Sequence, residues 1–288
     1  MTVSRRWTGR VFALPLAAAL LCAPARADEN FQINAVSLLG TTKAKPNAIT
    51  GMGTNDGNEF QAQFEHFGVT NWGYFYFDLE TYHGHGVGAL PPYGNNGSAA
   101  QMFANVTPGI SLAKVLGRSF TFGPVSDVSL IGDVRMGSYY QYQARGVGLS
   151  FNFYVPGFDW FESGLLTQNS TWNIEPTTFS TNTGKNYTLD KNKWLWRTYL
   201  ISKPIDWGSQ RFHYVFFSFI NGSGNGDSNR HGTEYFLRND LLWEIGGNSD
   251  YQIGVRYEYT RHQNSPLINF GDNRYTSHVP YLMFKGTL

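Results

Sequence analysis

The 288-residue chain carries 22 basic and 21 acidic residues, and aromatic residues make up 16% of it. Charged residues are only 15% of the chain, well below the roughly 25% of soluble domains. Because basic and acidic residues are almost equal in number, the composition excludes the basic surface of a nucleic-acid-binding protein. The single cysteine, Cys22, excludes a disulfide framework as the source of stability.

The N-terminus has the three parts of a secretory signal peptide: a basic region, an apolar region and a small-residue cleavage site. They are formed by Arg5, Arg6 and Arg10, by residues 11–21, and by Ala25-Arg26-Ala27. We expect cleavage near Ala27, which removes residues 1–27 and leaves 28–288 as one exported domain. Loss of the four arginines in this segment leaves 18 basic residues against 21 acidic ones.

Residues 58–82 alternate in polarity with a period of two, which predicts strands with two unlike faces. In 58–69, Phe60, Ala62 and Phe64 lie on the apolar face. The polar positions of this run and of 73–82 are Glu59, Gln61, Gln63, Glu65, Tyr74, Tyr76, Asp78 and Glu80. We expect the polar face to line a lumen and the apolar face to meet lipid.

Further strands follow along the chain, separated by long connections and short turns in alternation. The predicted strands are 31–41, 58–69, 73–82, 101–112, 125–137, 144–155, 160–171, 192–203, 210–221, 232–245, 251–262 and 275–288. No apolar run after residue 22 reaches the ~18 residues of a membrane-spanning helix. The sequence therefore predicts an all-β fold, a transmembrane antiparallel β-barrel of about 12 strands.

Long connections of such barrels lie outside the cell and short turns in the periplasm. We therefore expect residues 42–57, 83–100, 172–191, 222–231 and 263–274 at the cell surface. The expected location is the outer membrane of a Gram-negative bacterium.

The later strands add charged candidates on their predicted inward faces: Asp133, Arg135, Arg197, Arg238, Asp240, Arg256 and Glu258. Strand 192–203 is ambiguous, because Arg197 shares a face with Leu195 and Tyr199 while Trp194 and Trp196 face the other way. These charges either form a ladder that orients polar solutes or neutralise one another and fill the barrel. The pattern leaves both interpretations open.

Two tracts resemble the nucleoside-specific channel-forming outer membrane proteins, the Tsx-like family. One reads Val-Thr-Pro-Gly-Ile-Ser-Leu-Ala-Lys-Val-Leu-Gly over 106–117, followed by Ser-Phe-Thr-Phe-Gly-Pro-Val over 119–125. The other is Trp-Gly-Tyr-Phe-Tyr-Phe-Asp over 72–78. The resemblance implies a monomeric barrel of twelve strands with a narrow pore for passive diffusion of nucleosides.

The expected function is an outer-membrane channel for nucleosides or similar small polar aromatic solutes, with no enzymatic activity. Rings of Tyr74 and Tyr76 would stack on a base, and Asp78 would accept hydrogen bonds from ribose hydroxyls. A general small-solute porin and an outer-membrane barrel hydrolase remain as alternatives. We expect outer-membrane lipid as the surroundings, no nucleic acid polymer as partner, no cofactor and no metal; His83-Gly84-His85 is a weak metal signal without clustered cysteines or carboxylates.

Overall fold

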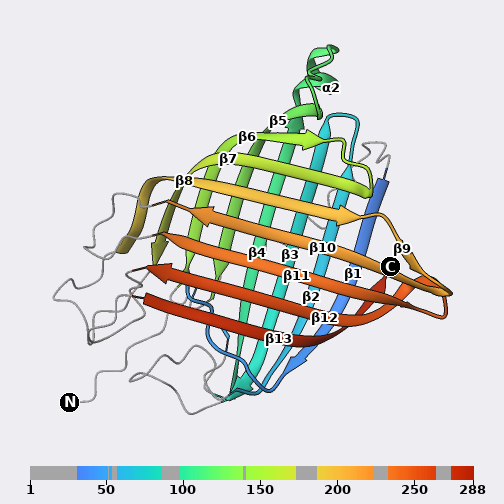
Figure 1. Cartoon of the computed structure of the whole chain (residues 1–288). Helices are drawn as coiled ribbons and strands as arrows, with labels where there is room; N and C mark the ends of the chain where they lie inside the picture. Colours follow the sequence, from blue (N-terminus) through green and yellow to red (C-terminus); the bar gives the residue numbers. More distant parts are fainter. Residues whose placement is uncertain are drawn as a thin grey trace.

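The computed structural model describes residues 31–50, 52–53, 57–85, 98–138, 141–172, 187–222, 233–263 and 274–288. The expected signal peptide lies outside these residues, and so does its cleavage site. Within them the chain is almost entirely β-strand, as the alternating pattern predicts (Figure 1).

Twelve long strands form one antiparallel sheet in which each pairs with the next, and the last pairs with the first. They are β1 (Phe31–Thr41), β2 (Glu59–Val69), β3 (Gly73–His85), β4 (Ser98–Ser111), β5 (Val125–Gly137), β6 (Gln143–Phe153), β7 (Phe158–Trp172), β8 (Tyr187–Ser202), β10 (Gln210–Asn221), β11 (Glu234–Ile245), β12 (Asn248–Gln263) and β13 (Arg274–Thr287). The three-residue β9 (Ile205–Trp207) extends the hairpin between β8 and β10. The predicted closed barrel of twelve strands is confirmed.

The outer face of the barrel is apolar and the inner face is polar. On β12, Tyr251, Ile253 and Val255 are about half exposed, whereas Gln252 between them and Arg256 after them are buried. Exposed aromatic side chains such as Tyr154 and Trp207 lie near the turns. An apolar exterior with aromatic residues near its turns is typical of a membrane-spanning barrel.

Short turns and both described ends of the chain lie at one end of the barrel, which we call the turn end. Phe31 at the start of β1 pairs with Val69, next to the 70–72 turn, and Leu288 donates its backbone N–H to the Asn34 carbonyl. The longer connections lie at the other end, the loop end. Antiparallel pairing reverses the chain at every connection, so successive connections alternate between the two ends, and an even number of strands brings both termini to the same end.

The turn between β4 and β5 contains α2 (Leu112–Leu116), a helix that the sequence analysis did not predict (Figure 1). Ser111 caps it by accepting a hydrogen bond from the backbone N of Lys114 at 3.1 Å. The Lys114 ammonium donates to the Thr70 carbonyl at 2.5 Å and so ties α2 to the neighbouring turn. The Ser-x-x-Lys spacing of the family-like tract is therefore explained by local structure. No helix in the described residues is long and apolar enough to cross a membrane.

Glycine in the same tract makes room for an inward aromatic ring. A Cβ placed on Gly109 of β4 would lie 2.2 Å from the Tyr74 ring. Only glycine lets the Tyr74 ring lie against the β4 backbone, where its side chain is buried.

Candidate functional site: the barrel lumen

All fifteen candidate residues point into the lumen, as their alternation predicts. Every one of them except Glu65 is buried, and the Glu65 side chain is only 14% exposed. The ambiguous strand is also decided: Leu195, Arg197 and Tyr199 of β8 point inward, and Trp194 and Trp196 are exposed. The structure therefore gathers the predicted site residues in one place.

Arg238 of β11 connects opposite walls of the barrel. Its Nε donates to Glu258 Oε1 on neighbouring β12 at 2.8 Å. Its Nη1 lies 3.5 Å from Asp78 Oδ2 on β3, and its Nη2 donates to Glu80 on the same strand. Because β3 and β11 lie on opposite sides of the barrel (Figure 1), this guanidinium spans the lumen.

The other arginines are also held by carboxylates. Arg256 makes a bidentate pair with Asp240, with both contacts at 2.8 Å. Arg135 donates to Asp133 at 2.8 Å, and Arg197 lies 3.3 Å from Glu162. Of the two interpretations left open, mutual neutralisation describes these contacts.

Glu59, Gln63 and Glu65 on β2 are held by their own partners. Tyr281 donates to Glu59 at 2.9 Å, Gln63 donates to Asp78 at 2.8 Å, and Lys285 donates to Glu65 at 2.9 Å. The β2 wall is thereby connected to β13 on one side and to β3 on the other.

Aromatic rings form a second set of contacts across the lumen. The centroids of Tyr76 on β3 and Tyr199 on β8 are 5.5 Å apart, and those of Phe67 on β2 and Trp160 on β7 are 5.0 Å apart. Such pairs add roughly 0.5–1.5 kcal/mol beyond burial. They lie beside the charged groups, since Tyr76 donates to Glu65 at 3.5 Å.

A third contact combines charge and ring. The Arg135 guanidinium lies 4.2 Å from the centroid of Phe219 on β10, a cation–π distance. Phe219 in turn stacks on Phe236 of β11, with centroids 5.0 Å apart and planes 8° apart. The mid-lumen is thus filled by alternating ionic and aromatic contacts.

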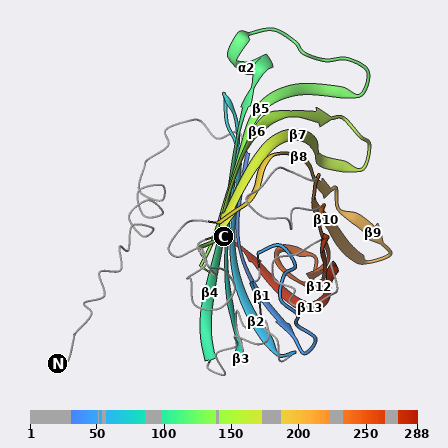
Figure 2. The same ribbon diagram turned by 90° about the vertical axis from the view of Figure 1, so that its left-hand side faces the viewer.

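Part of the first long connection also lies inside the barrel. Residues 44–50, 52 and 53, here called the plug segment, include Ala48, Ile49 and Met52, which are at most 1% exposed. Ala48 donates its N–H to Thr260 Oγ1 on β12 at 2.9 Å. Figure 2 shows this segment, in blue, inside the curve made by β1–β4 and β12–β13.

The plug segment reaches both walls. Gly53 donates its N–H to Gln101 Oε1 of β4 at 3.0 Å, opposite the contact with Thr260. Ile49 packs in the same apolar cluster as Phe219 and Phe236. The expectation that residues 42–57 form a surface loop is therefore wrong for this part, because its apolar side chains are buried in the lumen.

Several inward groups were missed from sequence. Lys193 on β8 and His262 on β12 both contact Glu234 of β11, at 2.8 and 3.1 Å. Trp160 and Glu162 lie on β7, which has apolar residues on both faces and so gave no clear alternation. Parity with a predicted inward arginine or glutamate was the signal available for each: Glu234 shares parity with Arg238, Lys193 with Arg197, and His262 with Glu258.

Some buried polar atoms have no hydrogen-bond partner among the described residues. On the β2–β4 wall they are both side-chain polar atoms of Gln61, Oε1 of Gln63, Oδ1 of Asn105 and Oγ1 of Thr107. An unpaired buried polar atom costs about 1–3 kcal/mol. This wall can therefore accept hydrogen bonds from a polar solute or donate them to it.

The histidines do not form the clusters expected of a metal site or a serine hydrolase in the described residues. Among the described residues, no three His, Cys, Asp or Glu side chains are placed to hold a metal ion. His66 and His278 lie on the outward faces of β2 and β13. His213 points inward and contacts Glu244 at 2.5 Å, a contact that involves no serine.

No family model and no curated protein matches the chain. One solved structure, a "Bacterial polysaccharide outer membrane secretin", covers 90% of this chain and 98% of its own, with 7% identity and a TM-score of 0.40. The barrel assignment rests on the strand pairing itself.

Proposed function

We propose that the protein is an outer-membrane channel for the passive diffusion of nucleosides or similar small polar aromatic solutes. The observation that carries the proposal is the mid-lumen layer, where the rings of Tyr76 and Tyr199 lie beside the carboxylates of Asp78 and Glu65. Rings offer stacking to a base, and carboxylates and amides offer hydrogen bonds to ribose hydroxyls.

The resemblance over 106–125 and 72–78 supports the same solute class. The closed barrel also supports a monomer, since every long strand is paired on both sides within the chain and offers no free edge.

A wide general porin is disfavoured by the contacts that span the lumen. Arg238 bridges to β3, Tyr76 meets Tyr199, and the plug segment connects β12 to β4. Transport then requires small displacements of the plug segment and the ring pairs, so that conductance is low and depends on solute contacts. Weak, reversible contacts suit transport, because a solute must also leave.

The experiment is single-channel recording in planar bilayers with uridine and with a small sugar. In the Tyr76→Ala variant the ring that would stack on a base is lost and the constriction widens. Stacking contributes about 1–3 kcal/mol per base. We therefore expect ionic conductance to rise while the uridine concentration that half-blocks the current increases at least about fivefold.

Asp78→Ala tests the hydrogen bonds to ribose and should weaken uridine block with little effect on the sugar. Phe77→Ala is the matched control, because Phe77 lies on the outward face of the same strand. Absence of uridine block in the wild-type channel contradicts the proposal. An equal loss for uridine and sugar in the Asp78 variant assigns the pore to general diffusion instead.

A further inference from the structure

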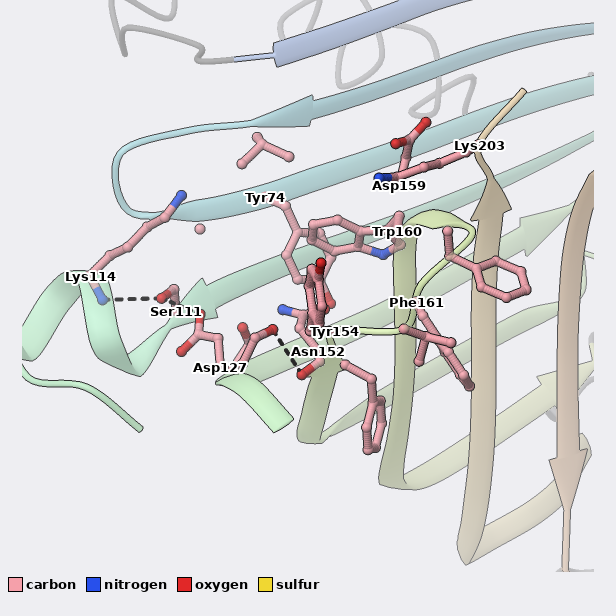
Figure 3. Close-up of a pocket in the computed structure, with 17 residues that line it drawn as sticks. Tyr74, Ser111, Lys114, Asp127, Asn152, Tyr154, Asp159, Trp160, Phe161 and Lys203 are labelled. Atoms are coloured by element: carbon pink, nitrogen blue, oxygen red, sulfur yellow. Dashed lines mark hydrogen bonds between the residues drawn. The ribbon is translucent and has the colours of Figure 1, made fainter. Parts of the chain in front are cut away.

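A cavity of about 400 Å³ opens at the turn end of the barrel, away from the plug segment. It lies between α2, the 70–72 turn and the start of β7, and we call it the turn-end vestibule. In Figure 3, Tyr74 and Trp160 lie at its centre, with Lys114, Ser111 and Asp127 to one side and Asp159 and Lys203 to the other. A cavity of this size is within the range of small-molecule sites.

The charged groups of the vestibule balance one another. Two lysines and two aspartates line it: Lys114, Lys203, Asp127 and Asp159. Asp127 is already engaged, since it accepts hydrogen bonds from Ser111 Oγ at 2.5 Å and from the backbone N of Val128 at 2.8 Å. Lys114 is engaged with the Thr70 carbonyl. The vestibule therefore offers no net charge to attract an ionic ligand.

Three neutral polar atoms of lining residues are not engaged. Ser129 Oγ, Asn152 Oδ1 and Trp160 Nε1 are buried and have no hydrogen-bond partner in the described part of the structure. Together they supply an N–H donor, a carbonyl acceptor and a hydroxyl that can do either. Buried atoms of this kind gain most from a ligand that completes their hydrogen bonds.

Trp160 is held in place by neighbouring rings. Its indole packs edge-to-face on Tyr74, with centroids 5.3 Å apart and planes at 72°, and on Phe67 at 5.0 Å and 70°. Tyr74 is fixed beneath it against Gly109. The Trp160 N–H is thus presented by a rigid group, which lowers the entropy cost of ligand binding.

We propose that the turn-end vestibule is a binding site for an uncharged solute that has a flat ring and several hydroxyl groups, a nucleoside in the first instance. Trp160 Nε1 donates to the solute, and Asn152 Oδ1 accepts from one of its hydroxyls. The identity of the solute rests on the proposed function; the site itself rests on the cavity and its three unengaged polar atoms. Of the residues that line this site, only Tyr74 is among the candidate residues predicted from the sequence.

The test is isothermal titration calorimetry of uridine and of 2′,3′-dideoxyuridine with the full-length barrel in detergent. Trp160→Phe keeps the ring and removes the donor, and Asn152→Leu removes the acceptor. Each should weaken uridine binding about fivefold, the worth of one hydrogen bond. Asn152→Leu should also reduce the preference for uridine over the dideoxy compound, because the acceptor no longer distinguishes them.

Trp196→Phe is the matched control, since Trp196 Nε1 donates to Ser163 on the outer face at 2.9 Å. Heat-modifiable gel migration checks that each variant is folded. If Trp160→Phe does not fold, the uridine affinity of Asn152→Leu tests the vestibule. If Trp160→Phe and Asn152→Leu both fold and both keep the wild-type affinity for uridine, the vestibule is not the binding site. That result leaves the proposed function standing if uridine still blocks the wild-type channel. Conversely, binding that depends on Trp160 in a barrel without uridine block supports the vestibule and contradicts the channel.

Discussion

At the scale of residues, one guanidinium holds together three carboxylates that come from two strands. Arg238 contacts Asp78 and Glu80 on β3 and Glu258 on β12, and all four side chains are at most 9% exposed. Removing one partner from a buried ionic cluster is costly because it leaves uncompensated charge. Arg238 is therefore both a structural bridge and the main balance to the acidic face of the lumen.

We expect Arg238→Gln to lower the free energy of unfolding by about 3–5 kcal/mol, the range for breaking a buried ion pair. The excess negative charge in the lumen should also make the residual conductance more selective for cations. Urea unfolding in detergent and reversal potentials under a salt gradient measure the two effects.

Arg211→Gln is the comparison for this substitution. Arg211 pairs with Asp206 at 2.9 Å and lies 3.9 Å from Glu244, but its side chain is 47% exposed, so water can replace these contacts. It should leave both measurements unchanged. Equal stability of the two variants would show that the Arg238 bridge does not hold the walls together.

At the scale of elements, the plug segment is held by few polar contacts to the barrel. Among the described residues, Ala48 bonds to Thr260 on β12, Gly53 bonds to Gln101 on β4, and the Lys45 carbonyl accepts from Ser277 Oγ on β13 at 3.5 Å. Bonds within the segment run through Asn47 and Thr50. A segment joined to the wall at so few points can leave the lumen without breaking the strand pairing. It is therefore the element most able to control passage at the loop end.

Thr260→Val removes the acceptor for the Ala48 N–H and keeps the side-chain shape. One hydrogen bond is worth about 1 kcal/mol, so the ratio of open to closed channel should rise about fivefold. Single-channel recordings measure the change as open probability. Thr198→Val makes the same replacement on the outer face of β8 and should have no effect. An unchanged open probability in Thr260→Val would mean that the plug segment does not gate the pore.

At the scale of the whole molecule, the two ends of the barrel differ in the lengths of their connections. The turn end holds the short turns, α2 and the vestibule, and the loop end holds the long connections and the plug segment. Barrels of this kind have their short turns in the periplasm. We therefore expect the vestibule on the periplasmic side.

Single-cysteine variants of the barrel test that orientation in intact cells. Gly157→Cys and Gly247→Cys lie in turns at the turn end and should stay unlabelled by an impermeant thiol reagent added outside. Asn95→Cys, Gly184→Cys and Asn225→Cys, in connections outside the described residues, should be labelled. The reverse pattern would place the vestibule at the cell surface.

The sequence by itself determined the twelve long strands and, where polar and apolar residues alternate clearly, which side chains point inward. Alternation with a period of two is a local property, and three predicted strands, 31–41, 125–137 and 210–221, agree with the structure at both ends. For strand β7 the sequence did not predict which side chains face inward, because apolar residues on both of its faces hide the alternation.

Only the tertiary structure decided which inward groups meet. Arg238 and Glu80 are 158 residues apart, and their contact depends on the curvature that brings β11 opposite β3. The burial of Ile49 in the lumen depends likewise on the space that the closed barrel leaves. The vestibule, too, is formed by turns from separate hairpins, since Trp160 and Tyr74 become neighbours only when the sheet closes. Periodicity along a strand reports the face on which a side chain lies, but closure of the sheet decides which face lies opposite.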